Sequence, residues 1–143
     1  RYAPLGARGM AASRQAFGLD IEEYFQQANS ETLVVVMIED IVAVENLPEI
    51  LKVDDIDVFF VAPSDLAQSM GLIGQIDHPK VKATITDTLN RIADAGRTPG
   101  AIAFESTADE IVGAGARFLM TSWLPYITVG AGAYLKAVEQ ASS

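Results

Sequence analysis

Residues 33–39 read Leu-Val-Val-Val-Met-Ile-Glu, and residues 56–65 read Ile-Asp-Val-Phe-Phe-Val-Ala-Pro-Ser-Asp. Both stretches contain a nearly continuous run of β-branched and aromatic residues, which is typical of a strand that is buried on both faces of a parallel sheet. Each run is followed by an acidic residue, Glu39 after the first and Asp65 after the second. We therefore expect two buried strands with a carboxylate just beyond the end of each.

The rest of the chain alternates between strand and helix patterns. Apolar spacing predicts helices over residues 20–29, 41–51, 79–95, 107–114 and 127–140, a short helical turn over 66–70, and further strands over 99–104 and 117–122. This alternation predicts an α/β fold with a parallel sheet and no internal domain boundary. Four such units are half of a (β/α)8 barrel, which takes around 250 residues. An open doubly wound sheet would show the same pattern, and spacing does not separate the two folds.

Composition narrows the class of protein. The 143 residues carry a net charge of −9, which disfavours binding to nucleic acid or to an anionic membrane. No apolar run approaches the roughly 20 residues of a membrane span, and the first residues lack the apolar segment of a signal peptide, so we expect a cytoplasmic protein. The chain has no cysteine and one histidine, so a metal would have to bind mainly to oxygen atoms.

Glu39 and Asp65 are the candidate ligands for such a metal. Consecutive parallel strands usually pair at a spacing of about 4.8 Å, which would bring the two carboxylates to the same edge of the sheet. Mg²⁺ and Mn²⁺ suit one or two carboxylates together with water or substrate oxygens. The alternative is that each acid only caps or stabilises the helix that follows it.

Two motifs carry a resemblance to a known family. Residues 36–40, Val-Met-Ile-Glu-Asp, and residues 62–71, Ala-Pro-Ser-Asp-Leu-Ala-Gln-Ser-Met-Gly, resemble the strand-end motifs of the HpcH/HpaI aldolase family. The loop at residues 6–9, Gly-Ala-Arg-Gly, and residues 113–118, Gly-Ala-Gly-Ala-Arg-Phe, are similar to further features of that family. The resemblance covers essentially the whole chain and matches the C-terminal half of the barrel, strands five to eight, as one domain over residues 1–143.

The resemblance implies a metal-dependent aldehyde-lyase. It would cleave or form 4-hydroxy-2-oxo acids through a metal-bound pyruvate enolate, with Mg²⁺ or Mn²⁺, or alternatively Co²⁺, held by Glu39 and Asp65. Backbone N–H groups of Ser64 and Asp65 would bind the pyruvate carboxylate, and Trp123 would wall the aldehyde pocket. The family also suggests a homo-oligomer, a trimer of dimers. Pyruvate and an aldehyde would be its small-molecule partners.

Several residues depart from the family pattern. Met37 stands where the aldolases carry a glutamine, and a thioether cannot donate that hydrogen bond. The family's catalytic histidine and arginine belong to the first half of the barrel, so this chain contains no certain catalytic residue and we expect no activity without that half. His78 is expected in a surface loop. Arg8 is a candidate for approaching the substrate or a neighbouring subunit. We do not assign the role of the family's catalytic arginine to Arg1, Arg8 or Arg14.

Two other functions remain open at this point. One is a lyase of the citryl-CoA or malyl-CoA type that uses the same two carboxylates. The other is a non-catalytic half-barrel assembly module, which Met37 favours. An isolated half barrel would expose the edges of its outer strands, so we expect the chain to have a partner.

Overall fold

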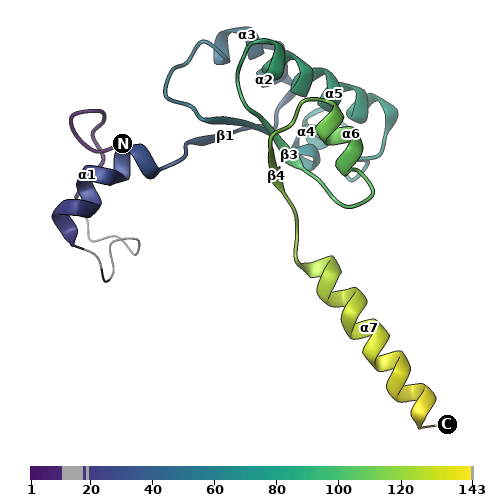
Figure 1. Ribbon diagram of the computed structural model, residues 1–143. Coiled ribbons are helices and arrows are strands. Elements are labelled where there is room, and N and C mark those ends of the chain that lie inside the picture. Colours follow the sequence, from purple (N-terminus) through teal and green to yellow (C-terminus); the bar gives the residue numbers. More distant parts are fainter. Residues whose placement is uncertain (11–17, 19, 143) are drawn as a thin grey trace. The chain divides into compact units, whose positions relative to one another are not determined.

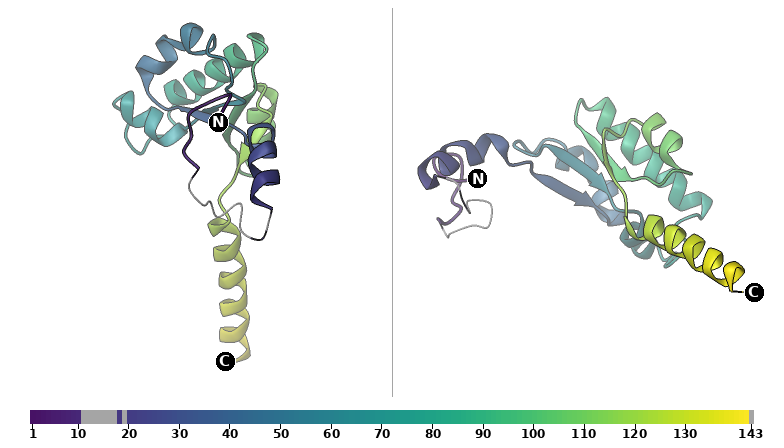
Figure 2. Two further views of the ribbon diagram at one scale, coloured as in Figure 1. Left: turned by 90° about the vertical axis from the view of Figure 1, so that its left-hand side faces the viewer. Right: turned by 60° about the horizontal axis from the view of Figure 1, so that its bottom comes forward.

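The structure of the chain is a computed structural model that describes residues 1–10, 18 and 20–142. The chain divides into two compact units, Arg1–Val34 and Val35–Ser143, each of which is considered separately. Figures 1 and 2 follow the chain through its helices and strands.

The first unit is built on helix α1, Ile21–Glu31, which confirms the helix predicted over residues 20–29. The side chain of Asp20 caps it by accepting a hydrogen bond from the backbone N–H of Glu23 at 3.0 Å. The side chain of Asn29 binds the backbone of Tyr2 through two hydrogen bonds. Its Oδ1 accepts from the N–H of Tyr2 at 2.7 Å, and its Nδ2 donates to the carbonyl of Tyr2 at 3.0 Å. The Tyr2 ring is 5% exposed.

The second unit contains a sheet of four parallel strands in the order β1-β2-β3-β4. The strands are β1 Val35–Ile38, β2 Val58–Val61, β3 Pro99–Ile102 and β4 Phe118–Met120. Each strand pairs with the next along the chain, so Ile38 lies opposite Val61 and Val61 lies opposite Ala101. The predicted α/β fold with a parallel sheet is confirmed.

Helices follow the strands as the sequence predicts, with three differences of more than one residue in their bounds. The helices are α2 Ile41–Glu45, α3 Leu47–Ile50, α4 Pro63–Ser69, α5 Pro79–Asp94, α6 Ala108–Gly113 and α7 Leu124–Ala141. The single helix expected over residues 41–51 is wrong: it is divided at Asn46, because Pro48 has no N–H to continue the hydrogen-bond ladder. Helices α4 and α7 each begin three residues earlier than expected, and both have a proline in the first turn.

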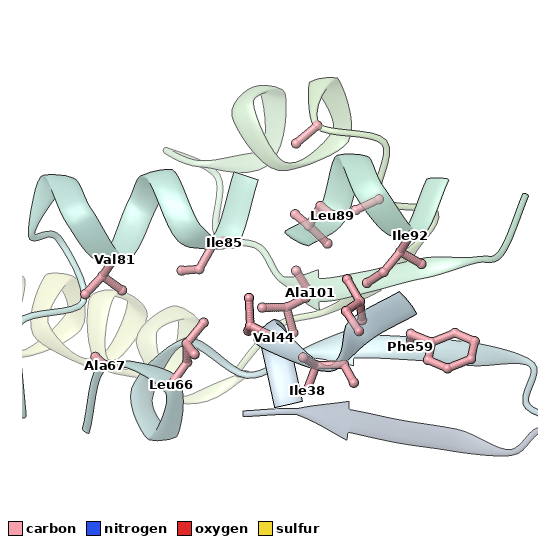
Figure 3. Close-up of a cluster of buried hydrophobic side chains, with 14 residues drawn as sticks. Ile38, Val44, Phe59, Leu66, Ala67, Val81, Ile85, Leu89, Ile92 and Ala101 are labelled. Carbon is pink, nitrogen blue, oxygen red and sulfur yellow. The ribbon is translucent and has the colours of Figure 1, made fainter. Parts of the chain in front are cut away.

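One face of the sheet packs against helices to form the main core. Strand residues Phe59 and Val61 are fully buried there, as are Leu66 of α4 and Leu89 and Ile92 of α5. Figure 3 shows Leu89 and Ile92 of α5 directed toward the strands, where Ile38 and Ala101 lie. This face is a complete hydrophobic core within the chain.

The opposite face, which we call the open face, is only partly covered. Val58, Phe60 and Ala62 of the β2 segment form a small cluster there, and the Phe60 and Phe118 rings meet edge to face with centroids 6.3 Å apart. Val35 and Met37 of β1, by contrast, are 39% and 59% exposed. The expectation that the first strand is buried on both faces is therefore wrong for the second unit taken by itself, because no described segment of that unit covers the open face of β1. It is correct for β2, whose four residues are all buried.

Candidate metal and substrate site

Glu39 lies directly after β1 and is half-buried. Side chains alternate between the two faces of a strand, and Ile38 packs into the helix-covered core, so Glu39 follows Met37 on the open face. Helix α2 begins two residues later, and its cap is Asp40, whose carboxylate accepts from the N–H of Val42 at 2.7 Å. The side chain that caps the helix is thus Asp40 and not Glu39.

Asp65 lies in the first turn of α4, and its side chain is exposed. The helix begins at Pro63 with Ala62 as its N-cap residue, and no side chain caps it. Asp65 is therefore inside the helix rather than at the capping position that the sequence left open. Ser64 and Asp65 are the second and third residues of α4, where backbone N–H groups have no partner within the helix.

The sheet brings the two acidic segments together. The last β1–β2 contact is the hydrogen bond from the N–H of Ala62 to the carbonyl of Ile38, at 3.2 Å. Glu39 is the residue after Ile38, and Asp65 is three residues after Ala62. Both carboxylates therefore follow the same rung at the carboxyl edge of the sheet, as the pairing of consecutive strands predicts.

A second hydrogen bond joins the same two segments, and the apolar and motif patterns do not predict it. The hydroxyl of Ser69, half-buried at the end of α4, accepts from the N–H of Ile41 at 2.9 Å and donates to the carbonyl of Leu66 at 2.9 Å. The second bond is a local contact that a serine near a helix end commonly makes. The first links residues 28 positions apart, which spacing alone does not reveal.

The donor set fits a hard divalent cation that keeps some exchangeable positions. Two carboxylates are the protein ligands that Mg²⁺ commonly uses, with water or substrate oxygens completing its octahedral shell. Among the residues that the structure describes, no group of three or more His, Cys, Asp or Glu side chains could hold a metal ion. A cation at Glu39 and Asp65 would therefore take its remaining ligands from water, from substrate or from beyond this chain.

The other candidate residues lie elsewhere. Trp123 is 67% exposed, directly before α7. His78 caps α5, where its Nδ1 accepts from the N–H of Lys80 at 3.1 Å. It is half-buried at a helix start, a structural role in keeping with its expected place outside the site.

The arginines of the first unit have local partners. The guanidinium of Arg8 lies over the ring of Tyr2, 4.9 Å from its centroid, and Nη1 of Arg1 donates to the carbonyl of Asn29 at 2.7 Å. Burial raises the pKa of the Tyr2 phenol, while the positive charge of Arg8 opposes that shift. Arg14 lies outside the described residues.

The structure also contains an apolar cavity that the sequence did not predict. It has a volume of about 80 Å³ and lies beside the ends of β2 and β3, between α5 and α6, with walls that include Val61, Ile85, Phe104 and Ile111. None of the residues predicted to bind metal or substrate lines it. Its walls also include Pro63, the first residue of α4.

The described helices include none that is both long enough and apolar enough to cross a membrane. The cytoplasmic location stays a prediction.

The parallel sheet followed by helices places this chain in the α/β class, in which ligands generally bind at the carboxyl edge of the sheet, where Glu39 and Asp65 lie. The chain belongs to the HpcH/HpaI aldolase/citrate lyase family, whose model matches residues 1–119. The predicted family is confirmed, and its description is that of lyase enzymes.

Individual relatives agree with this assignment. The chain is 40% identical over 122 residues to the 4-hydroxy-2-oxo-heptane-1,7-dioate aldolase of Shigella sonnei, covering 83% of this chain and 47% of that protein. A family protein from Burkholderia cenocepacia, with a solved structure, is 29% identical, with a TM-score of 0.80 over 95% of this chain and 54% of its own. An HpcH/HpaI aldolase from Desulfitobacterium hafniense is 27% identical, with a TM-score of 0.77 over 97% and 56%. The chain thus spans about half the length of the relatives that it matches.

Proposed function

We propose that this chain supplies the metal-binding and pyruvate-binding half of a (β/α)8-barrel lyase. Its four strands would be strands five to eight of the barrel. The first half of the barrel would cover the open face. The support is the parallel sheet, the exposed open face of β1 and the match to about half the length of the relatives.

The observation that carries the proposed chemistry is the placement of Glu39 and Asp65. They follow the last rung between two paired strands, and the helices after those strands begin at other residues. In the proposed site both carboxylates hold Mg²⁺ or Mn²⁺, with Co²⁺ as an alternative. When bound, the cation would supply Lewis acidity to the keto oxygen of pyruvate.

The rest of the proposed site is built from α4. The N–H groups of Ser64 and Asp65 donate to the carboxylate of pyruvate, and this orients its methyl carbon toward the aldehyde. Trp123 is proposed as a wall of the aldehyde pocket. The proton-transferring groups come from the other half of the barrel, so the isolated chain is proposed to bind without turning over.

We propose the cleavage or formation of 4-hydroxy-2-oxo acids as the reaction of the complete enzyme. The name of the Shigella sonnei relative supports this substrate class. A homo-oligomer is proposed as well, since every described residue of α7 is exposed, including Tyr134, Leu135 and Val138. Such a stretch of apolar surface is commonly covered in an assembly.

Exchange of the methyl protons of pyruvate for deuterium tests the proposal directly. The full-length protein should catalyse this exchange in the presence of Mn²⁺ and should lose it after chelation. Protein that binds Mn²⁺ and accepts CoA thioesters as substrates for carbon–carbon cleavage, but does not exchange the protons of pyruvate, would favour a lyase of the citryl-CoA or malyl-CoA type. The citrate lyase part of the family description keeps that candidate open.

Met37 favours a second candidate function, a non-catalytic assembly module. Its side chain lies on the open face two residues before Glu39 and cannot donate a hydrogen bond to a group bound there. Absence of both Mn²⁺ binding and proton exchange in the full-length protein would support that function over the lyase.

A further inference from the structure

We infer that Ser69 is a positioning residue that fixes the two metal-binding carboxylates relative to each other. This inference rests on the proposed function of Glu39 and Asp65. It concerns a side chain that does not touch the metal and acts through the backbone that carries the ligands.

The Ser69 hydroxyl takes part in two hydrogen bonds. Ser69 Oγ donates to the carbonyl of Leu66, three residues earlier in α4, at 2.9 Å. This bond directs the hydrogen of the hydroxyl toward its own helix and leaves an oxygen lone pair for another donor. That donor is the N–H of Ile41, at 2.9 Å.

The N–H of Ile41 lies at the start of α2. Ile41 is the first residue of the helix, and its N–H has no acceptor within the helix. Asp40 caps the next N–H, that of Val42. The first two N–H groups of α2, which begins two residues after Glu39, therefore both have side-chain acceptors. One acceptor is Asp40 of the same segment and the other is the hydroxyl of Ser69 in α4.

Helix α4 carries both Asp65 and Ser69. Asp65 and Ser69 are four residues apart in one helix, so they lie on the same face, one turn from each other. The helix is anchored at Leu66 and Ala67, both 0% exposed. Its far end is fixed by a turn in which Gly71 adopts φ +75° and the N–H of Leu72 donates to Ala67 at 2.8 Å. Ser69 therefore projects from a well-anchored helix.

Two hydrogen bonds join the segment that carries Glu39 to the segment that carries Asp65, one on either side of these residues. One is the rung from Ala62 to Ile38, and the other is the bond from Ile41 to Ser69. Glu39 lies between the two bonds on one segment and Asp65 lies between them on the other. Loss of the hydroxyl would remove the second bond and let the carboxylates shift, which matters because Mg²⁺ requires nearly ideal octahedral geometry.

The test is the affinity of full-length protein for Mn²⁺, measured by titration calorimetry together with the melting temperature of each variant. We expect Ser69→Ala to weaken Mn²⁺ binding by about tenfold, as is typical for the loss of a group that orients metal ligands. Ser69→Cys, which is similar in size but a weak acceptor, should behave in the same way. Ser69→Thr retains the hydroxyl and should restore affinity to within about threefold of the wild type.

Thr88→Val is the matched control. The Thr88 hydroxyl is buried and donates to the carbonyl of Thr84 at 2.7 Å within α5, so its removal also costs one helix hydrogen bond. Among the described residues, this hydroxyl bonds to no segment outside α5, and Mn²⁺ affinity should stay within about twofold of the wild type.

Three results would overturn the inference while leaving the proposed function intact. They are wild-type affinity in Ser69→Ala, failure of Ser69→Thr to restore binding, and an equal loss in Thr88→Val. Wild-type protein that does not bind Mn²⁺ at all would overturn the proposed metal site, and the inference with it.

Discussion

The two faces of the sheet differ sharply in how much of their packing this chain provides. On the helix-covered face, Phe59 and Val61 are fully buried against side chains of α4 and α5. On the open face, packing is limited to a small cluster on β2, β3 and β4, and Met37 of β1 is 59% exposed. Stability therefore resides mainly on the helix-covered face, whereas the proposed chemistry lies at the carboxyl edge of the sheet, where Glu39 follows the open face and Asp65 lies in the first turn of α4.

The largest expected effect follows from the proposed site. Asp65→Asn in the full-length protein should reduce lyase activity by about a thousandfold or more, because it removes a charged ligand of the Lewis acid. The side chain is exposed, so the free energy of unfolding should change by no more than about 0.5 kcal/mol. Steady-state kinetics and chemical denaturation measure the two quantities. Asp54→Asn, at an exposed acid of a turn, is the control and should keep activity.

The helix-covered face should show the opposite behaviour. Leu89→Ala removes a fully buried side chain from the main core and should lower the free energy of unfolding by about 2–5 kcal/mol. Activity per folded molecule should remain, since Leu89 lies on the side of the sheet away from Glu39. Urea denaturation gives the stability. Val42→Ala, at a side chain that is 64% exposed, should cost much less, and equal losses for the two variants would contradict the core described here.

Gly100→Ala tests how tightly the covered part of the open face is packed. A Cβ at this position would lie 2.9 Å from Cγ1 of Val58, 3.1 Å from the Phe60 ring and 3.1 Å from the carbonyl of Phe118. The absence of a side chain at Gly100 allows the two rings to meet across the strand between them. We expect a loss of about 1–3 kcal/mol from overpacking, measured by denaturation. Gly113→Ala, where a Cβ has nothing within 4 Å, should not show this loss.

The smallest effect is expected at His78. Asparagine is also a good N-cap residue, so His78→Asn should leave the free energy of unfolding within about 0.5 kcal/mol and should not change activity. His78→Ala should cost about 1 kcal/mol by removing the cap. A large loss of activity in His78→Asn would show that this histidine transfers protons after all.

The order of strands and helices could be predicted from the sequence because each strand is a compact apolar run and each long helix has periodic apolar residues. The edge of the sheet that carries Glu39 and Asp65 followed from the same pattern. The break at Asn46 was missed because the apolar periodicity continues through Pro48. The exposure of Met37 was missed because an apolar run carries no information on whether the chain itself covers both of its faces.

The tie between Ser69 and Ile41 could not be predicted for a different reason. It depends on the distance between a hydroxyl and a backbone N–H that are 28 residues apart, which only the folded geometry sets. The cap of α2 had a local signal in the sequence, since Asp40 directly precedes the helix. The resemblance pointed to the strand-end acids as ligands, and although its second motif, residues 62–71, includes Ser69, it assigned that serine no role.

The most direct test of the central claim is a calorimetric titration of the full-length protein with Mn²⁺, with and without pyruvate. The proposed site predicts binding that strengthens in the presence of pyruvate and that is lost in both Glu39→Ala and Asp65→Ala. Glu45→Ala, at an exposed acid at the end of α2, should bind as the wild type does. Absence of binding in the wild-type protein, or binding that both site variants retain, would contradict the assignment of Glu39 and Asp65 as metal ligands.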